Sequence, residues 1–427
     1  MMKVPTSARR VPLVSGIAIL LLAGSDVVAR QQQSASATWI TAWGSSQQAL
    51  GTTAITNATV RMIARVAIGG EAVRVRLDNA FGTSPVVIGS AYIGQRTQSA
   101  ALASGSNRQL LFNGSARVSI PAGGTVVSDA ASMTVLPQQD LAISLYVPGQ
   151  GVRPSQHAAA FVTSYASANG SGDVSADETR TPFSGSTTSL LWLKSIDVLS
   201  SSSTGSIVAF GDSITDGTCS TVDTHNRWED WLSVRLKLDA QERGRPQMFR
   251  AMVNEGIGGN TVTREQLQPP PDSPPGIERL ERDVLSHHGV THVILFMGTN
   301  DIRRGASLAQ VTGGIEDIIG RVKARGLKIV GVTIIPRHNA AASGTNTGWD
   351  ASKTGIRRTI NQWIRTRARF DAVLDFDSVV RDSLNWDLIS PPFNCDGIHP
   401  TPRGYYEMGK SVPLDLFRGG PGPTSRR

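Results

Sequence analysis

The chain divides into two parts that differ in the spacing of their apolar positions. Between residues 38 and 200, apolar and polar side chains alternate with a period of two, which is typical of half-buried β-strands. The alternation runs over residues 60–68 and 73–77, and Gly69-Gly70 between them predicts a β-hairpin. It returns at residues 141–147. Many short strands without a long helical period predict an antiparallel β-sandwich of the jelly-roll kind.

From residue 206 onward, short apolar runs alternate with longer stretches of helical period. Strands are predicted at residues 207–210, 248–253, 293–297, 329–335 and 373–376. Helices are predicted at residues 228–238, 308–324, 352–369 and 402–416. This alternation of strand and helix predicts a parallel sheet with helices on both faces, which is a three-layer α/β/α domain of the flavodoxin-like kind.

The N-terminus has the features of an export signal. Lys3, Arg9 and Arg10 precede an apolar stretch at residues 11–23, and small residues follow up to Ala29. The stretch is too short to span a bilayer comfortably. We therefore expect a signal peptide at residues 1–29 and a secreted or periplasmic protein without a membrane span after cleavage. An uncleaved anchor is the alternative.

Changes of composition mark the remaining boundaries. Residues 164–189 are rich in Ser, Gly, Thr and Asp, which predicts a long surface loop, and the serine-rich residues 200–205 predict a linker. We therefore predict a β-sandwich domain at 38–200, an α/β domain at 206–418 and a flexible tail at 419–427.

Composition and charge exclude several classes of function. The 427 residues are 40% apolar and 18% charged with a net charge of +8, but Lys and Arg are scattered and form no basic run with interleaved aromatics. We therefore expect no nucleic-acid partner. No HExxH or CxxC spacing, no GxxxxGK loop and no GxGxxG after a strand is present, so we expect neither a metal nor a cofactor. The oligomeric state is not predicted.

Polar residues with catalytic potential follow the predicted strands. Gly211-Asp212-Ser213 follows the first, Gly258-Gly259-Asn260 the second and Gly298-Thr299-Asn300 the third, while Asp396-Gly397-Ile398-His399 precedes the last helix. In an open α/β sheet, ligands bind beyond the carboxyl ends of the strands. The Gly-Asp-Ser tripeptide by itself also fits a helix N-cap, so the four segments together carry the prediction.

These four segments, in this order and spacing, resemble the four blocks of SGNH (GDSL-type) hydrolases. The resemblance covers residues 206–417. Upstream, Trp39-Ile40-Thr41-Ala42-Trp43 and residues 74–82 look like the β-domain of a two-domain branch that resembles xylanase-associated carbohydrate esterases. Residues 226–230 also resemble that branch, with Glu229 where proline is commoner.

The resemblance implies a role for each matched residue. Ser213 would be the nucleophile, His399 the general base and acid, and Asp396 the residue that orients the imidazole. The backbone N–H groups of Ser213 and Gly259 and the side-chain amide of Asn300 would form an oxyanion hole.

Other polar residues receive weaker interpretations. We expect Asp212 and Asp301 to bind loop amides beside the site. His287-His288 precedes a strand in a polar stretch, which favours a solvated helix end. His225 either lines the pocket or is structural, and His157 has no partner that the sequence identifies.

The two cysteines, Cys219 and Cys395, lie in the loops that would carry the nucleophile and the other triad residues. If the triad assembles, these loops must come close, and an exported protein meets an oxidising compartment. We therefore predict a disulfide between them. Two buried free thiols are the alternative.

The function expected is that of a secreted serine esterase that hydrolyses carboxylic esters, most simply by removing acetyl groups from carbohydrate such as acetylated polysaccharide. A lipase or small-molecule carboxylesterase is an alternative, as is an acyltransferase with the same triad. A carbohydrate-binding protein with an inactive hydrolase domain belongs to a different class, and the four intact blocks argue against it.

Overall fold

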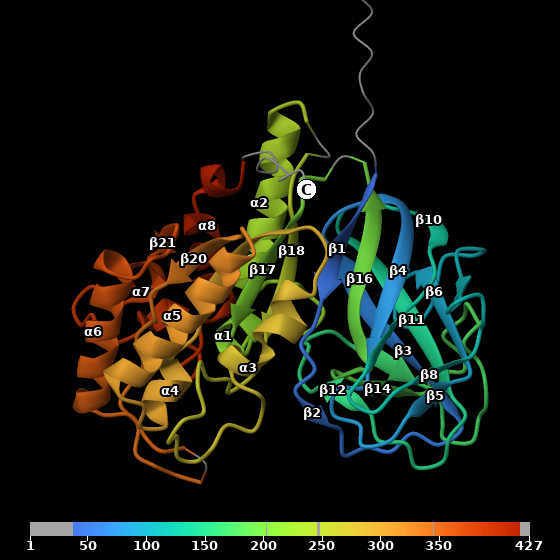
Figure 1. Cartoon of the computed structure of the whole chain (residues 1–427), viewed down its shortest axis with the longest axis horizontal. Coiled ribbons are helices and arrows are strands. Elements are labelled where there is room, and N and C mark those ends of the chain that lie inside the picture. Colours follow the sequence, from blue (N-terminus) through green and yellow to red (C-terminus); the bar gives the residue numbers. More distant parts are fainter. Residues whose placement is uncertain (1–36, 202, 246–247, 345, 419–427) are drawn as a thin grey trace, which may run out of the picture. The chain divides into compact units, whose positions relative to one another are not determined.

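The structure of the protein is a computed structural model that describes residues 37–418, except 202, 246–247 and 345 (Figure 1). The predicted signal peptide at 1–29 and the predicted tail at 419–427 lie outside the described residues. Within the described residues, no helix combines the length and apolar character needed to cross a membrane.

Antiparallel sheets occupy the first half of the chain. One sheet has the order β1 (Thr38–Gly44), β16 (Leu193–Ser200), β4 (Gly70–Asp78) and β10 (Ala131–Val135), and β9 (Thr125–Val127) also pairs with β4. The second has the order β14 (Gly185–Thr187), β13 (Ser164–Ala166), β3 (Ala58–Val66), β11 (Gln139–Val147), β6 (Ser90–Gln95) and β7 (Arg108–Leu110). Two small sheets are β15 (Leu190–Leu191), β12 (Ser155–His157) and β2 (Ala49–Leu50), and β5 (Val86–Ile88) with β8 (Val118–Ile120).

The predicted hairpin at residues 60–77 is wrong. Strand β3 pairs with β11 and β13, whereas β4 pairs with β16, β9 and β10, so the two strands belong to different sheets. Their apolar side chains enter one shared cluster of buried residues. A side chain at Gly70 would lie 2.2 Å from the carbonyl oxygen of Leu199, so glycine lets the chain pass close to β16 as it changes sheets.

The second half of the chain forms one parallel sheet with the order β18 (Ala251–Gly256), β17 (Ser206–Gly211), β19 (Val290–Phe296), β20 (Lys328–Val332) and β21 (Ala372–Leu374). The helices are α1 (Ser213–Asp216), α2 (Trp228–Glu242), α3 (Gly276–Leu280), α4 (Thr299–Arg303), α5 (Leu308–Ala324), α6 (Ala351–Thr366), α7 (Phe376–Val380) and α8 (Pro402–Ser411). A π-helical turn (Glu281–Leu285) extends α3, and 3-10 turns lie at Pro391–Phe393 and Leu414–Phe417. The parallel sheet is thus confirmed.

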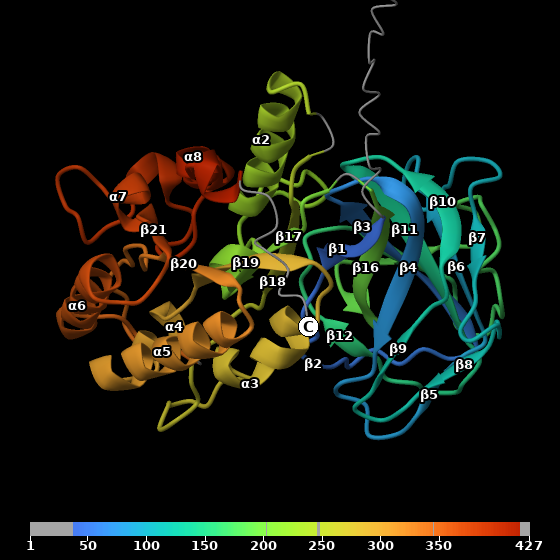
Figure 2. The ribbon, with the colours of Figure 1, turned by 45° about the horizontal axis from the view of Figure 1, so that its top comes forward.

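Helices cover both faces of this sheet. Along β17, Ile207 and Ala209 pack in one cluster of buried side chains, with α2 and α8, while Val208 and Phe210 pack in another, with α5 and α6. Successive side chains of a strand point to opposite faces. Figure 2 shows α2 and α8 above the sheet and α3 and α5 below it.

Most predicted elements of this half lie within a few residues of the observed ones. The second strand begins three residues later than predicted, and the fourth ends at Val332 rather than 335. The predicted loop at 164–189 contains the short strands β13 and β14, which pair with each other.

The change from antiparallel to parallel pairing occurs at the predicted linker, between β16 and β17. The two halves nevertheless lie in the same compact unit. The division into two domains stays a prediction.

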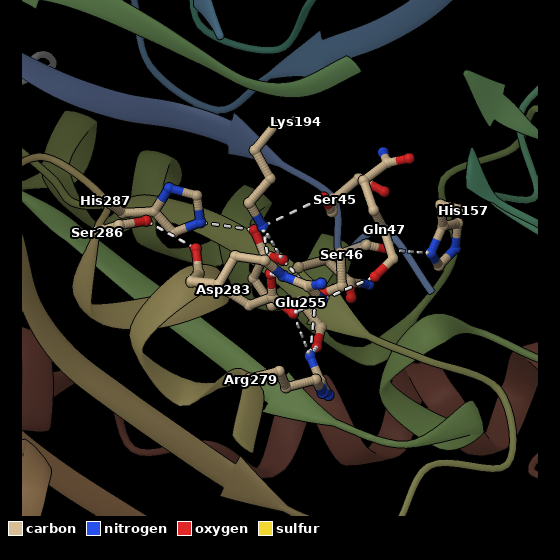
Figure 3. A network of polar contacts seen from close by, with 12 residues as sticks. Ser45, Ser46, Gln47, His157, Lys194, Glu255, Arg279, Asp283, Ser286 and His287 are labelled. Carbon is tan, nitrogen blue, oxygen red and sulfur yellow. Dashed lines mark hydrogen bonds and ion pairs between the residues drawn. The ribbon is translucent and has the colours of Figure 1, made fainter. Parts of the chain in front are cut away.

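A buried ion network joins the two halves (Figure 3). Lys194 on β16 donates to Glu255 Oε2 on β18 at 3.0 Å and to Asp283 Oδ1 at 2.9 Å. Asp283 also accepts from Arg279 at 3.2 Å and from Arg282 at 2.8 Å. Lys194 is 1% exposed and both carboxylates are fully buried. Because buried charges must be compensated, the network ties the antiparallel half to the parallel sheet.

Candidate active site

Ser213 lies where the first parallel strand meets a short helix. Strand β17 is buried along its length and ends at Gly211, and α1 begins at Ser213. A side chain at Gly211 would lie 2.1 Å from Thr215 Oγ1, so glycine permits this turn. Ser213, 7% exposed, is therefore held at the carboxyl edge of the sheet, as predicted from the sequence.

The structure brings Ser213, His399 and Asp396 together. Ser213 Oγ lies 2.8 Å from His399 Nε2, and His399 Nδ1 lies 2.7 Å from Asp396 Oδ2. The other oxygen of Asp396 accepts the backbone N–H groups of Ile398 at 2.9 Å and His399 at 2.8 Å. With Nδ1–H donating to the carboxylate, Nε2 is left to accept the serine proton.

The Asp396 carboxylate is ionised over a wide pH range. Partial burial, the largest effect, raises its pKa, but the hydrogen bond and charge of His399 and the two backbone N–H groups outweigh it and lower the pKa to about 2. Asp396 therefore remains a charged acceptor for His399 at neutral pH.

The predicted disulfide between Cys219 and Cys395 is present, with 6.5 Å between the Cα atoms. It joins the loop after α1 to the loop that carries Asp396 and His399. A second tie lies beside it, since Tyr405 Oη on α8 donates to the carbonyl oxygen of Thr218 at 2.7 Å. The loop after α1 and the loop that carries Asp396 and His399 are therefore held against each other.

Removing the disulfide with the double variant Cys219→Ser/Cys395→Ser is expected to lower the free energy of unfolding by about 2–4 kcal/mol, because the bond closes a long loop. Urea denaturation of variant and wild type measures this loss. Thiol titration of the unfolded, unreduced wild-type protein should find no free thiol. Two free thiols per chain would contradict the assignment.

The three oxyanion candidates lie at the ends of three neighbouring strands. Ser213 is the first residue of α1, Gly259 follows β18 with φ of +72°, and Asn300 lies in α4 directly after β19. Asn300 Nδ2 donates to the carbonyl oxygen of Asn260 at 3.0 Å, which places Asn300 beside the loop of Gly259. Within the described part of the chain, neither the N–H of Ser213 nor that of Gly259 has a hydrogen-bond partner. These donors are thus available to a ligand.

Asn300→Ala is expected to lower kcat by about 10²- to 10³-fold with little change in KM, because an oxyanion donor acts on charge that develops in the transition state. Steady-state kinetics on a soluble ester measure both constants, and circular dichroism checks the fold. A raised KM with unchanged kcat would instead make Asn300 a ground-state binding residue.

Asp212 and Asp301 bind loop amides, as predicted. Asp212 Oδ1 accepts from Ile214 N at 3.0 Å, and the Asp301 carboxylate accepts from Val262 N at 2.9 Å and Thr263 N at 3.1 Å. Burial raises the pKa of Asp212 to about 6 and that of Asp301 to about 7. Both carboxylates therefore help to hold the loops around Ser213.

The sequence interpretation of His287 is wrong, because this residue is 6% exposed rather than solvated. Its Nε2 lies 2.6 Å from Oε1 of Glu255, and Glu255 lies at the centre of the ion network in Figure 3. Its partner Glu255 lies on β18, 32 positions earlier in the chain, so the sequence around His287 gives no sign of this contact. The neighbouring His288 has a 41% exposed side chain and contacts Asp197 at 2.9 Å.

Sequence reasoning missed Arg279, which contacts the end of β17, the strand that precedes Ser213. Its guanidinium donates to the carbonyl oxygen of Gly211 at 2.8 Å and to Asn260 Oδ1 at 3.0 Å, and its side chain is fully buried. It therefore links the ends of β17 and β18. No local pattern marks this residue, since an arginine in a short helix normally faces solvent.

Arg337 was also missed, although it lies two residues after the predicted fourth strand. Its side chain is 5% exposed and its guanidinium lies 5.3 Å from the ring centroid of Trp349. Burial, followed by the charge of Arg303, lowers the pKa of Arg337 to about 10 against the opposite effects of Asp212 and Asp396. A charged residue after a parallel strand was the signal that could have found it.

Within the described residues, one group of side chains lies close enough together to be considered as metal ligands. It consists of Cys219, Asp396 and His399, whose donor atoms lie within 4.8 Å of one another. The Cys219 sulfur is bonded to Cys395 and is no thiolate. Both nitrogens of His399 are engaged with Ser213 and Asp396. This donor set does not fit a metal ion.

Residues 209–406 match the model of the family described as GDSL-like Lipase/Acylhydrolase family. No match to a curated protein was found. The matched segment contains Ser213, Gly259, Asn300, Asp396 and His399. It supports the GDSL/SGNH lipase-acylhydrolase family, and hence a hydrolase acting on esters, for this part of the chain.

Solved structures similar to this chain include a carbohydrate acetylesterase, Est24 from Sinorhizobium meliloti, with 18% identity, a TM-score of 0.35 and coverage of 48% of this chain and 94% of that chain. A lipase/acylhydrolase from Enterococcus faecalis has 22% identity, a TM-score of 0.35 and coverage of 48% and 92%. A member of the lipolytic protein G-D-S-L family from Veillonella parvula has 20% identity, a TM-score of 0.35 and coverage of 50% and 97%.

Proposed function

We propose that this protein is a serine esterase that hydrolyses carboxylic esters through an acyl-enzyme formed on Ser213. The observation that carries the proposal is the chain of hydrogen bonds from Ser213 Oγ through His399 to Asp396, at 2.8 and 2.7 Å. A nucleophile, a base and an orienting carboxylate in this order are what acyl transfer requires.

In this mechanism His399 Nε2 takes the hydroxyl proton as Ser213 Oγ attacks the ester carbonyl carbon. The N–H groups of Ser213 and Gly259 and the amide of Asn300 stabilise the negative charge on the carbonyl oxygen. The tetrahedral intermediate collapses as His399 returns the proton to the leaving alcohol. Water then attacks the acyl-enzyme by the same route and releases the acid.

We propose removal of acetyl groups from carbohydrate as the specific activity. The support is the resemblance of residues 39–43 and 74–82 to a branch similar to xylanase-associated carbohydrate esterases. A lipase or small-molecule carboxylesterase would use the same triad. The intact hydrogen-bond chain favours an enzyme over a carbohydrate-binding protein with an inactive hydrolase domain.

We also propose the finer features of fold and location. The strand order β18-β17-β19-β20-β21 corresponds to the 2-1-3-4-5 order of flavodoxin-like sheets. The two larger antiparallel sheets, which share one buried cluster, support a sandwich of the jelly-roll kind. The N-terminal pattern supports export to the periplasm or the medium.

The test is hydrolysis of a series of nitrophenyl esters of increasing acyl length, beside acetate release from acetylated xylan. A carbohydrate acetylesterase should cleave the acetyl ester much faster than the octanoyl ester and release acetate from xylan. A preference for long acyl chains would favour the lipase. No hydrolysis of any ester by the folded protein would reject the proposed function.

A further inference from the structure

His157 connects the antiparallel half of the chain to the helix that begins with the serine. It is the last residue of β12 and is 4% exposed. Its Nδ1 lies 2.9 Å from the carbonyl oxygen of Ser46, and its Nε2 lies 3.0 Å from Asp216 Oδ1. Figure 3 shows His157 at one end of the polar network, with its ring directed at Ser46.

Both partners of this ring are acceptors. A backbone carbonyl and a carboxylate have no proton to give, so each ring nitrogen must donate. A neutral imidazole carries one N–H and would leave a lone pair facing an oxygen in a buried site, which is costly. With Asp216 as the ionised carboxylate, this geometry places both protons on His157, and the buried imidazolium is paired with Asp216.

Asp216 connects His157 to two parts of the candidate active site. It is the last residue of α1, whose first residue is Ser213. Its second oxygen, Oδ2, accepts the backbone N–H of Gly258 at 3.0 Å, next to the oxyanion candidate Gly259. A side chain at Gly256 would lie 2.2 Å from Asp216 N, so α1 and the end of β18 are in close contact.

We propose that His157 is a positioning residue, which as an imidazolium holds Asp216 so that the serine helix and the Gly258-Gly259 loop keep the geometry needed for oxyanion stabilisation. This inference rests on the proposed function. It assigns the antiparallel half a part in catalysis, since both His157 and its partner Ser46 belong to that half. Asp216 is the link between the halves.

The electrostatics around His157 agree with a protonated ring. Burial, the largest effect, lowers its pKa, but the charge of Asp216, the hydrogen bonds to Asp216 and Ser46, and the charge of Glu255 raise it above its ordinary value of 6.5. A cavity of about 60 Å³ adjoins the ring. The other charged or titratable side chains that line this cavity are Arg65 on β3, His225, and Arg227, Glu229 and Asp230 at the start of α2.

Arg227 also lies near Asp216, but it donates to the backbone carbonyl oxygen of that residue, at 3.5 Å, whereas His157 contacts the carboxylate itself. Burial lowers the pKa of His225 to about 4, so this residue is neutral in the physiological range. Burial raises the pKa of Glu229 to about 8, and Arg227 lies between Glu229 at 3.2 Å and Asp230 at 2.9 Å. The side chain of Arg65 pairs with Asp140 at 2.7 Å.

The direction in which pH affects the contact between His157 and Asp216 follows from the raised pKa of His157. The stabilising contact is complete below the unfolded value of about 6.5 and is lost as the pH rises through the folded value. We therefore expect kcat to fall on the alkaline side as His157 loses its proton, with KM much less affected.

The experiment compares two variants with a matched control. In His157→Gln, the single amide nitrogen cannot occupy the positions of both ring nitrogens, so one of the two acceptors loses its donor. The value of kcat should then fall about 10- to 100-fold with KM nearly unchanged, as for a misplaced catalytic group. In Asp216→Asn, the introduced amide oxygen can accept from Gly258 and the nitrogen can donate to a neutral His157, so the alkaline fall of kcat should disappear. His225→Gln changes the same residue type in the same cavity without touching α1, and should keep kcat within about threefold of wild type.

Nitrogen-15 NMR of labelled histidine gives a readout that does not depend on activity. Among the seven histidines, the His157 signals, assigned by their loss in His157→Gln, should show two protonated nitrogens at about pH 7 in wild type and one in Asp216→Asn. If His157→Gln does not fold, Asp216→Asn provides the assignment.

The outcomes separate this inference from the proposed function. Retained hydrolysis in Ser213→Ala would reject the proposed function itself. Loss of hydrolysis in Ser213→Ala, together with wild-type kcat in folded His157→Gln or a neutral His157 ring at neutral pH, would overturn only the role of His157.

Discussion

Ser213→Ala is expected to lower kcat for ester hydrolysis by about 10⁴-fold or more while the fold is unchanged. Its Oγ is the atom that faces His399 Nε2, and no acyl-enzyme can form without it. The side chain packs at the turn between β17 and α1, where a smaller side chain fits. Steady-state kinetics and circular dichroism measure the two parts of this prediction.

Labelling gives an independent check of the same residue. An organophosphonate should modify Ser213 in wild type, as read by mass spectrometry, and nothing in Ser213→Ala. Ser220→Ala is a suitable control, because Ser220 lies in the loop that follows α1, whereas the ring nitrogens of His399 contact Ser213 and Asp396. Substantial activity in folded Ser213→Ala would remove Ser213 as the nucleophile.

Lys194→Met is expected to lower the free energy of unfolding by about 3–5 kcal/mol, because it leaves two buried carboxylates short of a cation. Lys194 donates to Glu255 at 3.0 Å and to Asp283 at 2.9 Å, across the boundary between the two halves. Methionine has a similar length, so the loss reports charge rather than volume. Urea denaturation measures it.

An exposed ion pair supplies the control. Arg264 and Glu278 lie 2.6 Å apart with side chains 48% and 44% exposed, so Arg264→Gln should cost less than about 1 kcal/mol. Equal effects of the two substitutions would contradict the assignment of Lys194 as a buried counter-ion.

The stability difference between wild type and Lys194→Met should depend on pH in a defined direction. Burial, the largest effect, raises the pKa of Glu255, but the charges of Lys194 and His287 lower it below 4.5 overall. The ionised carboxylate therefore stabilises the fold above its ordinary pKa, and this stabilisation is lost as the pH falls through the lowered value. Wild type and variant should accordingly converge in stability at acid pH.

Periodicity and turn residues were enough to predict most elements of the parallel half. The helix predicted at 308–324 is α5 with the same bounds, because its apolar positions repeat at the helical period and Ser307 caps its N-terminus. Short helices such as α4 and α7 were not predicted, since five residues hold too little periodicity. The local pattern could not predict which strands pair, as the wrongly predicted hairpin of β3 and β4 shows. Alternation tells which side chains face a core and not which strand lies beside them.

The candidate site divides in the same way. Ser213, Asn300, Asp396 and His399 could be chosen from the sequence because each stands in a short motif at a strand or helix end, where topology gathers groups at one edge of a sheet. The proximity of Cys219 and Cys395 then followed from the loops that carry the motifs.

The residues that support this edge were decided only by the tertiary structure. The sequence analysis interpreted His287 as solvated, gave His157 no partner and singled out neither Lys194 nor Arg279. In the fold their partners come from strands and helices far away in the chain, and burial makes each charge depend on those partners. A motif specifies the atoms that react, because their spacing is local. The charges that hold those atoms in place depend on contacts that only the packed chain creates.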